Sequence, residues 1–319
     1  MADPRRDCPF LAVRIAVIGL AWVPLHGICE PASLPAEAAV EEVVVSAPEP
    51  RYVAPTTRDR IGRIWAPVLL NGKGPYRMVL DTGASHSAIV QRVVDELALP
   101  VKEKAVRVRG VTGSAVVSTA KVDSLEFGEL RIDHLKLPVV AAVFGGADGV
   151  LGSDGLRDKR IVIEFRRDRI TVVRSHRTPA PPNYAVVPFK NDPLRGMRAN
   201  ITVGSVKAVG IIDTGSQATV GNLALRDALA RSALQGDAGD IGIEGVTEDI
   251  QFGTRVRVPN VVLGDLMLRS PRVLFSDLHI FEQWHLTKEP TLLIGMDILG
   301  VLDTLVIEYK RNELYIKTR

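Results

Sequence analysis

Two aspartates in this sequence, Asp81 and Asp213, each begin the tripeptide Asp-Thr-Gly, and each follows a run of apolar residues. Two carboxylates held about 3 Å apart cannot both ionise cheaply, so they share one proton. The charged member can take a proton from water while the neutral member donates a hydrogen bond to a carbonyl oxygen. The two aspartates therefore predict a catalytic dyad that adds water to a carbonyl group without a metal, a cofactor or a covalent intermediate.

The residues that follow each aspartate suit such a dyad. Gly83 and Gly215 have no side chain, so two loops can approach closely there and offer backbone N–H groups. Thr82 and Thr214 each carry a hydroxyl group that can bond across to the opposite loop. We expect these four residues to support the site.

The two loops differ at the next position, which is Ala84 in the first copy and Ser216 in the second. The hydroxyl group of Ser216 is expected to donate to an outer oxygen of Asp213 and to stabilise its charged form. The sequence thus predicts that Asp213 carries the charge and Asp81 the shared proton.

The sequence surrounding each aspartate occurs twice. The matching segments are 64–83 with 197–215, 106–113 with 241–248, 125–130 with 261–266, 149–156 with 292–299, and 161–165 with 305–309. The aspartates stand 132 positions apart, which is too long a period for a solenoid, whose repeats span about 20–50 residues. The pattern predicts a duplicated domain.

Each copy reads as about seven short strands with one or two brief helices, at 91–97 in the first copy and 223–230 in the second. Glycines break the alternating runs, and polar turns separate the strands. This pattern is typical of all-β structure of the small-barrel type.

The composition of the flanking segments predicts the organisation of the domains. Residues 1–38 are expected to be a signal peptide or N-terminal anchor, and 39–60 a linker. The first lobe is expected at 61–173, a Pro-rich linker at 174–183, and the second lobe at 184–319.

Residues 11–25 are largely apolar, follow Arg5 and Arg6, and precede small residues, as an export signal would. Arg14 interrupts the run, which is shorter than the roughly 20 apolar residues of a spanning helix. A signal peptide is the favoured interpretation, with an uncleaved membrane anchor and a disordered leader as alternatives. The sequence therefore predicts an exported protein that is periplasmic or associated with the cell envelope.

Bulk composition excludes several other classes. The only cysteines are Cys8 and Cys29, so neither a disulfide nor a Cys nucleophile is possible after Glu30. The formal net charge is +3, and no basic block with interleaved aromatics exists, so nucleic acid is not expected as a partner. The six histidines are scattered, and no metal site is predicted.

Taken together, the motifs make the chain resemble the retropepsin-like aspartic peptidases, of the kind found in bacterial exported proteins. The motifs that carry the resemblance are Asp-Thr-Gly-Ala-Ser at 81–85, Asp-Thr-Gly-Ser-Gln at 213–217, Val-Leu-Gly at 150–152 and Leu-Ile-Gly at 293–295. The resemblance implies an all-β fold of two tandem retropepsin-like (acid protease) barrel lobes related by a pseudo-two-fold axis.

The same resemblance implies an aspartic endopeptidase that cleaves peptide or protein substrates and needs no cofactor. It implies that hairpins close over the substrate as flaps, with Gly110 and Val111 in one flap and Gly245 and Val246 in the other. With both motifs in one polypeptide, the chain is expected to be a single-chain pseudo-dimer and a monomer.

The sequence also departs from the family. Many retropepsins have an Asp two residues after the glycine of Asp-Thr-Gly and an Arg after the apolar-apolar-Gly segment. This chain has Ser85 and Gln217 at the first position, and Ser153 and Met296 at the second. Asp154 and Asp297, one residue further on, are expected to be helix N-caps.

Two other functions stay open at this point. One is a non-catalytic peptide-binding or inhibitor-like module on the same fold, although a site that had lost its activity would have no need of both acids. The other is a structural β-rich envelope protein in which the motifs occur by coincidence.

Overall fold

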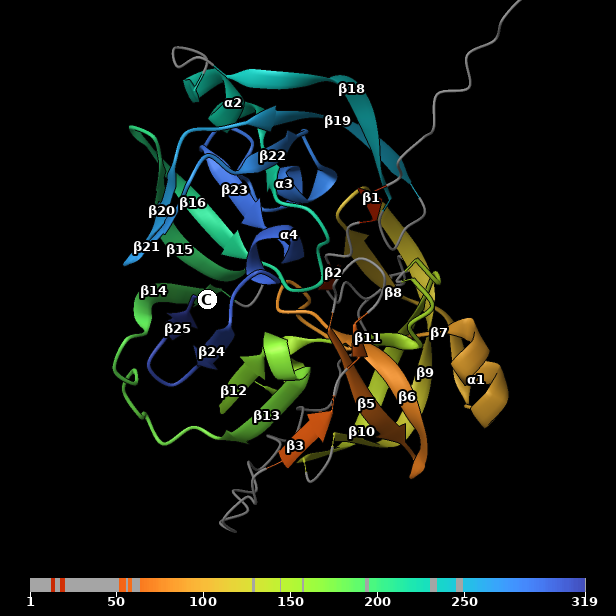
Figure 1. The fold of residues 1–319 in the computed structure, drawn as a ribbon. Helices are drawn as coiled ribbons and strands as arrows, with labels where there is room; N and C mark the ends of the chain where they lie inside the picture. Colours follow the sequence, from red (N-terminus) through yellow and green to blue (C-terminus); the bar gives the residue numbers. More distant parts are fainter. Residues whose placement is uncertain are drawn as a thin grey trace, which may run out of the picture.

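The protein consists mostly of β-strands arranged as two lobes joined by a shared sheet (Figure 1). The computed structural model describes residues 64–318 apart from 128–129, 144, 157, 193–194, 230–233 and 245–248. Before residue 64 it describes four short strands, which are β1 (Val13–Arg14), β2 (Ile18–Leu20), β3 (Tyr52–Pro55) and β4 (Thr57–Arg58).

The N-terminal lobe is a twisted sheet with the order β2-β8-β9-β10-β7-β11-β6-β5-β4. Its elements are β5 (Ile64–Leu70), β6 (Lys73–Leu80), β7 (Ala88–Val90), α1 (Gln91–Leu97), β8 (Val101–Gly110), β9 (Ser114–Phe127), β10 (Leu130–Val140) and β11 (Gly149–Leu151). A 3-10 turn, Ser153–Gly155, follows β11.

The C-terminal lobe repeats this plan with small changes. Its elements are β15 (Gly196–Val203), β16 (Val206–Ile212), β17 (Val220–Gly221), α2 (Leu223–Leu229), β18 (Gln235–Glu244), β19 (Ile250–Arg257), β20 (Val261–Leu263), β21 (Leu266–Leu268), β22 (Arg272–Phe275), α3 (His279–Gln283), β23 (Thr291–Ile294) and α4 (Met296–Leu299). The helix α3 lies between β22 and β23. At the equivalent place in the N-terminal lobe, between β10 and β11, the described residues contain no helix.

Six strands form the sheet between the lobes, in the order β3-β13-β12-β24-β25-β14. Their remaining bounds are β12 (Lys159–Glu164), β13 (Arg169–Arg174), β14 (Ala185–Asp192), β24 (Thr304–Glu308) and β25 (Glu313–Lys317). The order is symmetric about its centre, where Val162 of β12 is paired with Val306 of β24. The pseudo-two-fold axis of the molecule therefore passes through this antiparallel pair.

In each lobe a central strand ends at the Asp-Thr-Gly motif. Met78, Val79 and Leu80 of β6 are buried on both faces of the sheet, as an apolar run predicts for an interior strand. β6 pairs in parallel with β11, and β16 pairs in parallel with β23 in the same way. The motif thus emerges at equivalent places in the two lobes.

The predicted all-β fold with two lobes is confirmed. The predicted helices correspond to α1 and α2. The linker was expected at 174–183; Arg174 is the last residue of β13, and 175–183 contain no helix or strand. The predicted leader (1–38) and first linker (39–60) lie outside the described residues, except for the short strands β1 to β4. Among the described residues, no helix has the length and apolar character needed to cross a membrane.

A buried ion pair holds the sheet between the lobes. The carboxylate of Glu308 on β24 is fully buried and lies 3.1 Å from the guanidinium of Arg160 on β12. It also accepts a hydrogen bond from Ser175. Removing one partner from a buried pair leaves the other charge uncompensated, which is strongly destabilising.

We expect Glu308→Ala to lower the free energy of unfolding by about 3–5 kcal/mol, because Arg160 would stay buried without its partner. The matched control is Asp227→Ala, because Asp227 pairs with Arg226 on the exposed surface of α2 and should lose no more than about 1 kcal/mol. Urea denaturation measures both losses. Equal losses would show that Glu308 does not stabilise the junction of the lobes.

Candidate active site

The two Asp-Thr-Gly loops meet where the lobes join, and both aspartates are buried, with exposed fractions of 1% for Asp81 and 0% for Asp213. Their positions follow from the strands, since the Asp81 N–H donates to Leu151 of β11 and the Asp213 N–H donates to Ile294 of β23, each at 3.0 Å. The structure therefore brings together two acids that are far apart in the sequence.

Each carboxylate is fixed by its own loop. Oδ1 of Asp81 accepts the N–H groups of Gly83 and Ala84 at 2.8 and 2.9 Å. Oδ1 of Asp213 accepts the equivalent N–H groups, from residues 215 and 216, at 2.9 and 3.1 Å. Oδ2 accepts none of these four N–H bonds in either acid.

The threonine hydroxyl groups lock the two loops together. Oγ1 of Thr82 donates to the carbonyl of Ile212 at 2.9 Å, and Oγ1 of Thr214 donates to the carbonyl of Leu80 at 2.7 Å. Each hydroxyl oxygen also accepts the backbone N–H of the other threonine, at 3.1 Å in both directions. Four buried hydrogen bonds thus cross the pseudo-two-fold axis, as the sequence led us to expect.

Gly83 lies against the opposite acid. A Cβ atom at this position would come within 2.8 Å of Cγ and 2.9 Å of Oδ1 of Asp213. Real Cβ atoms do not approach so closely, so any larger residue would push the loops apart. The glycine is therefore a requirement of the close approach between the two carboxylates.

The environment of Asp213 favours its protonated form. Burial is the largest cause that raises its pKa well above the usual value, and the charge of Asp81 and a hydrogen bond with its carboxyl group act in the same direction. The N–H bonds from Gly215 and Ser216 lower the pKa but do not offset these causes. The pair therefore retains a proton at a pH where two separate aspartates would both be ionised.

The prediction for the Ser216 side chain is wrong. Its hydroxyl group donates to the carbonyl of Ala218 at 2.8 Å and not to Asp213, because that carbonyl lies within reach in the same turn. Ser216 supports the acid through its backbone N–H, as Ala84 does in the other loop. The predicted assignment of the charge to Asp213 therefore loses its basis, since the expected side-chain bond to that acid is not made.

The N-cap prediction for Asp154 and Asp297 is also wrong, since the residues at the two N-cap positions are Gly152 and Gly295. Oδ1 of Asp154 accepts the hydroxyl group of Ser87 at 2.9 Å. Oδ1 of Asp297 likewise accepts the hydroxyl group of Thr219 at 2.7 Å.

Ser87 and Thr219 complete this connection, since each hydroxyl oxygen also accepts a backbone N–H from the glycine of the apolar-apolar-Gly segment. The two pairs of residues connect the segment to the chain that follows the Asp-Thr-Gly loop. The sequence contains a signal for them, since both hydroxyl residues stand six positions after the aspartate of their Asp-Thr-Gly motif.

The tip of the β8–β9 hairpin reaches the other lobe. Val111 is fully buried within a cluster that otherwise consists of C-terminal-lobe residues. Its carbonyl accepts the N–H of Ile280 at 3.1 Å, and Ser114 Oγ lies 3.0 Å from Nε2 of His279 on α3. The hairpin predicted from Gly110 and Val111 therefore rests on α3, whereas Gly245 and Val246 lie outside the described residues.

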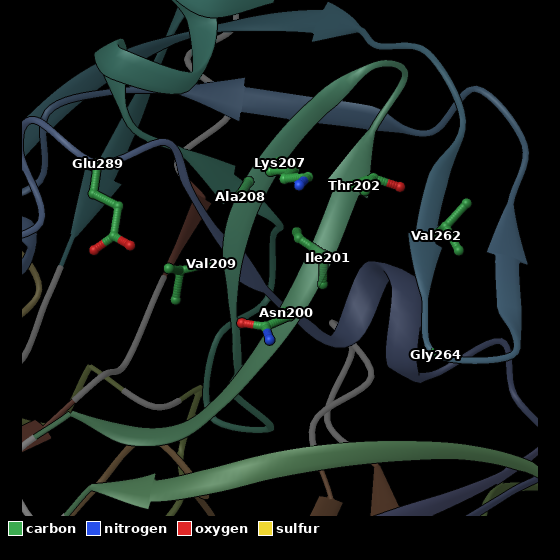
Figure 2. A pocket seen from close by; sticks show the side chains of 9 residues that line it. All are labelled: Asn200, Ile201, Thr202, Lys207, Ala208, Val209, Val262, Gly264 and Glu289. Carbon is green, nitrogen blue, oxygen red and sulfur yellow. The ribbon is translucent and has the colours of Figure 1, made fainter.

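A hollow of about 590 Å³ lies elsewhere, on the outer side of the C-terminal lobe (Figure 2). Figure 2 shows Asn200 of β15, Val209 of β16 and Glu289 among the side chains that line it. Neither aspartate contributes to its lining, so this hollow is separate from the dyad. No group of three His, Cys, Asp or Glu suited to a metal ion occurs in the part of the chain that the structure describes.

Comparisons with known proteins agree with the class of site. Residues 66–154, a stretch that contains Asp81, match a family described as aspartyl protease. No curated protein matches the sequence. Among solved structures, the chain is similar to the crystal structure of basic 7S globulin from soybean, with 11% identity, a TM-score of 0.45, and coverage of 85% of this chain and 96% of that chain.

The threonine bonds generate a prediction about stability. Thr82→Val keeps the shape of the side chain but leaves the Ile212 carbonyl and the Thr214 N–H without their partner, so the free energy of unfolding should fall by about 2–4 kcal/mol. Thr82→Ser keeps the hydroxyl group and should recover most of this loss. Chemical denaturation measures both variants, and a valine variant as stable as the serine variant would contradict the interlock.

The raised pKa of Asp213 generates a prediction about pH. In the unfolded chain the pKa of Asp213 is about 3.9, and in the folded protein it is raised. Between these two pKa values the folded state binds more protons than the unfolded chain, so the free energy of unfolding falls as the pH rises through this range. Asp213→Asn removes the cost of the buried charge. We expect the variant to be more stable than wild type at about pH 7, with the difference shrinking towards about pH 4.

Thermal unfolding of both proteins across this pH range provides the measurement. Asp227→Asn, at an exposed carboxylate on α2, is the control and should leave the pH profile of wild type unchanged. An Asp213→Asn profile parallel to that of wild type would refute the raised pKa.

Proposed function

We propose that this protein is an aspartic endopeptidase of the retropepsin-like kind, in which one chain supplies both catalytic acids, Asp81 and Asp213. The observation that carries the proposal is the contact of two buried carboxylates from equivalent loops locked together by threonine hydroxyl groups. The aspartyl protease family match over 66–154 supports the first of these acids.

The proposed reaction uses a water molecule placed between the Oδ2 atoms of the two acids. The ionised carboxylate takes a proton from this water, and the protonated carboxyl donates to the carbonyl oxygen of the scissile bond. Water adds to the carbonyl carbon to give a gem-diol. Proton transfer to the amide nitrogen then breaks the C–N bond and leaves the dyad with one proton.

The surroundings support this chemistry. Val79 precedes Asp81 by two residues, Ile211 precedes Asp213 by two, and both side chains are fully buried. A dry, apolar floor strengthens the interaction between the carboxyl groups and disfavours the doubly ionised pair. The N–H groups that bind Oδ1 hold each acid in place without competing for Oδ2.

We also propose that the site is complete in a monomer and that its substrates are peptides or proteins bound in extended form beneath the β8–β9 hairpin. The leader-like N-terminal sequence supports export to the periplasm or cell envelope, with membrane anchoring as a variant.

Substitution of either acid tests the proposal. Asp81→Asn and Asp213→Asn should each lower kcat/KM for a peptide substrate by at least about a hundredfold, because each loses one half of the acid–base pair. The double variant should be no worse than either single one, since the two acids act as a unit. Asp227→Asn serves as the control for the change of charge.

Activity within tenfold of wild type in either single variant would mean that the dyad assignment is wrong. Specific activity that falls steeply on dilution would mean that a second chain completes the site. A protein that binds peptides but never cleaves them would be the non-catalytic module of the same fold.

A further inference from the structure

A hollow of about 250 Å³ lies in the N-terminal lobe, over three neighbouring strands and away from the tip of the β8–β9 hairpin. Figure 1 shows these strands, β8, β9 and β10, in the N-terminal lobe. The residues that line the hollow are Pro100, Val101, Lys102, Ala105, Thr119, Lys121 and Lys136. None of them belongs to an Asp-Thr-Gly loop, so the hollow is separate from the dyad.

The three lysines of this hollow lie on one face of the sheet. Lys121 of β9 is directly opposite Lys136 of β10, and Lys102 of β8 is opposite Thr119 of β9. Thr119 and Lys121 are two residues apart on one strand, so their side chains share a face, and neighbouring strands lie only about 4.8 Å apart. The three ammonium groups, each on a flexible stem, can therefore reach a single small ligand.

No carboxylate of the described residues neutralises this group of lysines. The lining contains no acid, and none of the three lysines has an ion pair within the described part of the chain. The acid of β8, Glu103, accepts a hydrogen bond from Ser118 at 3.0 Å instead. Like charges directly opposite each other on antiparallel strands are destabilising. A concave site of this kind attracts an anion, which would remove the repulsion between the lysines.

The rest of the lining adds a hydroxyl group and an apolar wall. Thr119 is only 4% exposed, and its hydroxyl group has no hydrogen-bond partner among the described residues. The apolar wall consists of Pro100, Val101 and Ala105, and Val101 is 41% exposed. These features fit a ligand that has a compact anionic group and an apolar part beside it.

The types of residue in the lining favour phosphate over carboxylate as the anionic group. The hollow has no arginine, whose planar guanidinium matches a carboxylate with two parallel hydrogen bonds. Lysine instead acts as a compact point charge and commonly binds phosphate in this way. A phosphomonoester carries a charge of about −1.5 to −2 at neutral pH. It therefore balances three ammonium groups more fully than a singly charged carboxylate does.

We propose that this hollow binds the phosphate group of an organic phosphate, whose apolar substituent lies against Val101 and its apolar neighbours. The three lysines bind the phosphate oxygens, and the hydroxyl group of Thr119 donates to one of them. Such a group occurs both in soluble phosphomonoesters and in the headgroups of membrane lipids. The proposal does not depend on the proposed peptidase function, because no residue of the hollow takes part in the dyad.

Isothermal titration calorimetry of the full chain with hexyl phosphate tests the proposal. Hexyl phosphate should bind at least about tenfold more tightly than inorganic phosphate, because its alkyl chain leaves water. It should also bind at least about tenfold more tightly than hexanoate, which has fewer charged oxygens for the lysines. Added salt should weaken the binding, since the lysines are exposed.

Co-sedimentation with lipid vesicles distinguishes the two sources of the phosphate group. Binding to vesicles that contain phosphatidic acid, but not to vesicles of phosphatidylcholine alone, would assign a lipid headgroup. Binding of hexyl phosphate without binding to either kind of vesicle would assign a soluble phosphomonoester. Both results support the proposed site, provided that the lysine variants abolish the binding.

Substitution of the lysines tests the location of the site. Lys102→Gln and Lys121→Gln should each weaken hexyl phosphate binding at least about tenfold. Lys310→Gln, at an exposed lysine between β24 and β25, is the matched control and should leave the affinity unchanged. Lys136→Glu places an opposite charge across from Lys121, so it should abolish binding while the free energy of unfolding rises. Misfolding therefore cannot account for the loss of binding in this variant.

Three results would overturn the proposal. The first is that neither hexyl phosphate nor phosphatidic acid vesicles bind to the wild-type protein. The second is binding that survives Lys136→Glu, which would show that the phosphate lies elsewhere on the molecule. The third is hexanoate binding as tight as that of hexyl phosphate, which would remove the assignment to phosphate.

Discussion

The structure depends on the close approach of two buried carboxylates. Burying two carboxylates side by side is unfavourable unless other groups offset the cost. Two negative charges in an apolar setting are costly, and the cost is met here by a retained proton, by two N–H donors to each acid, and by the threonine bonds across the axis. The need for two matching donor sets explains why equivalent loops of a duplicated chain form the site. The sheet β3-β13-β12-β24-β25-β14 then fixes the distance between the lobes.

Support for the loops comes from residues that differ from those of many retropepsins. The acid and base that those proteins have near the motif are absent from the sequence, and each lobe has a carboxylate-hydroxyl pair beside its loop, Asp154 with Ser87 and Asp297 with Thr219. Burial raises the pKa of Asp297, and hydrogen bonds from Thr219 and Ile298 oppose that effect. Hydrogen bonds thus join the apolar-apolar-Gly segment to the chain that follows the Asp-Thr-Gly loop in each lobe.

The sequence was sufficient to predict the features that occur in both copies of the duplicated domain. The duplicated motif predicted the two aspartates, the strands that lead to them, the helices α1 and α2, and the hydroxyl bonds of Thr82 and Thr214. Local choices among acceptors were not predictable, because the Ser216 hydroxyl selects the Ala218 carbonyl only once the turn has formed. Features present in one copy only were missed as well, since α3 and its contact with Val111 have no counterpart to compare.

The central claim is that Asp81 and Asp213 share one proton within a single folded chain. It is tested most directly by a carbon-13 NMR titration of the aspartate carboxyl groups in the wild-type protein, with Asp81→Asn and Asp213→Asn used to assign the two signals. The account predicts that both signals respond to two separate titration steps and that one proton stays on the pair well above about pH 4. Two carboxyl groups that titrate independently near about pH 4 would contradict it.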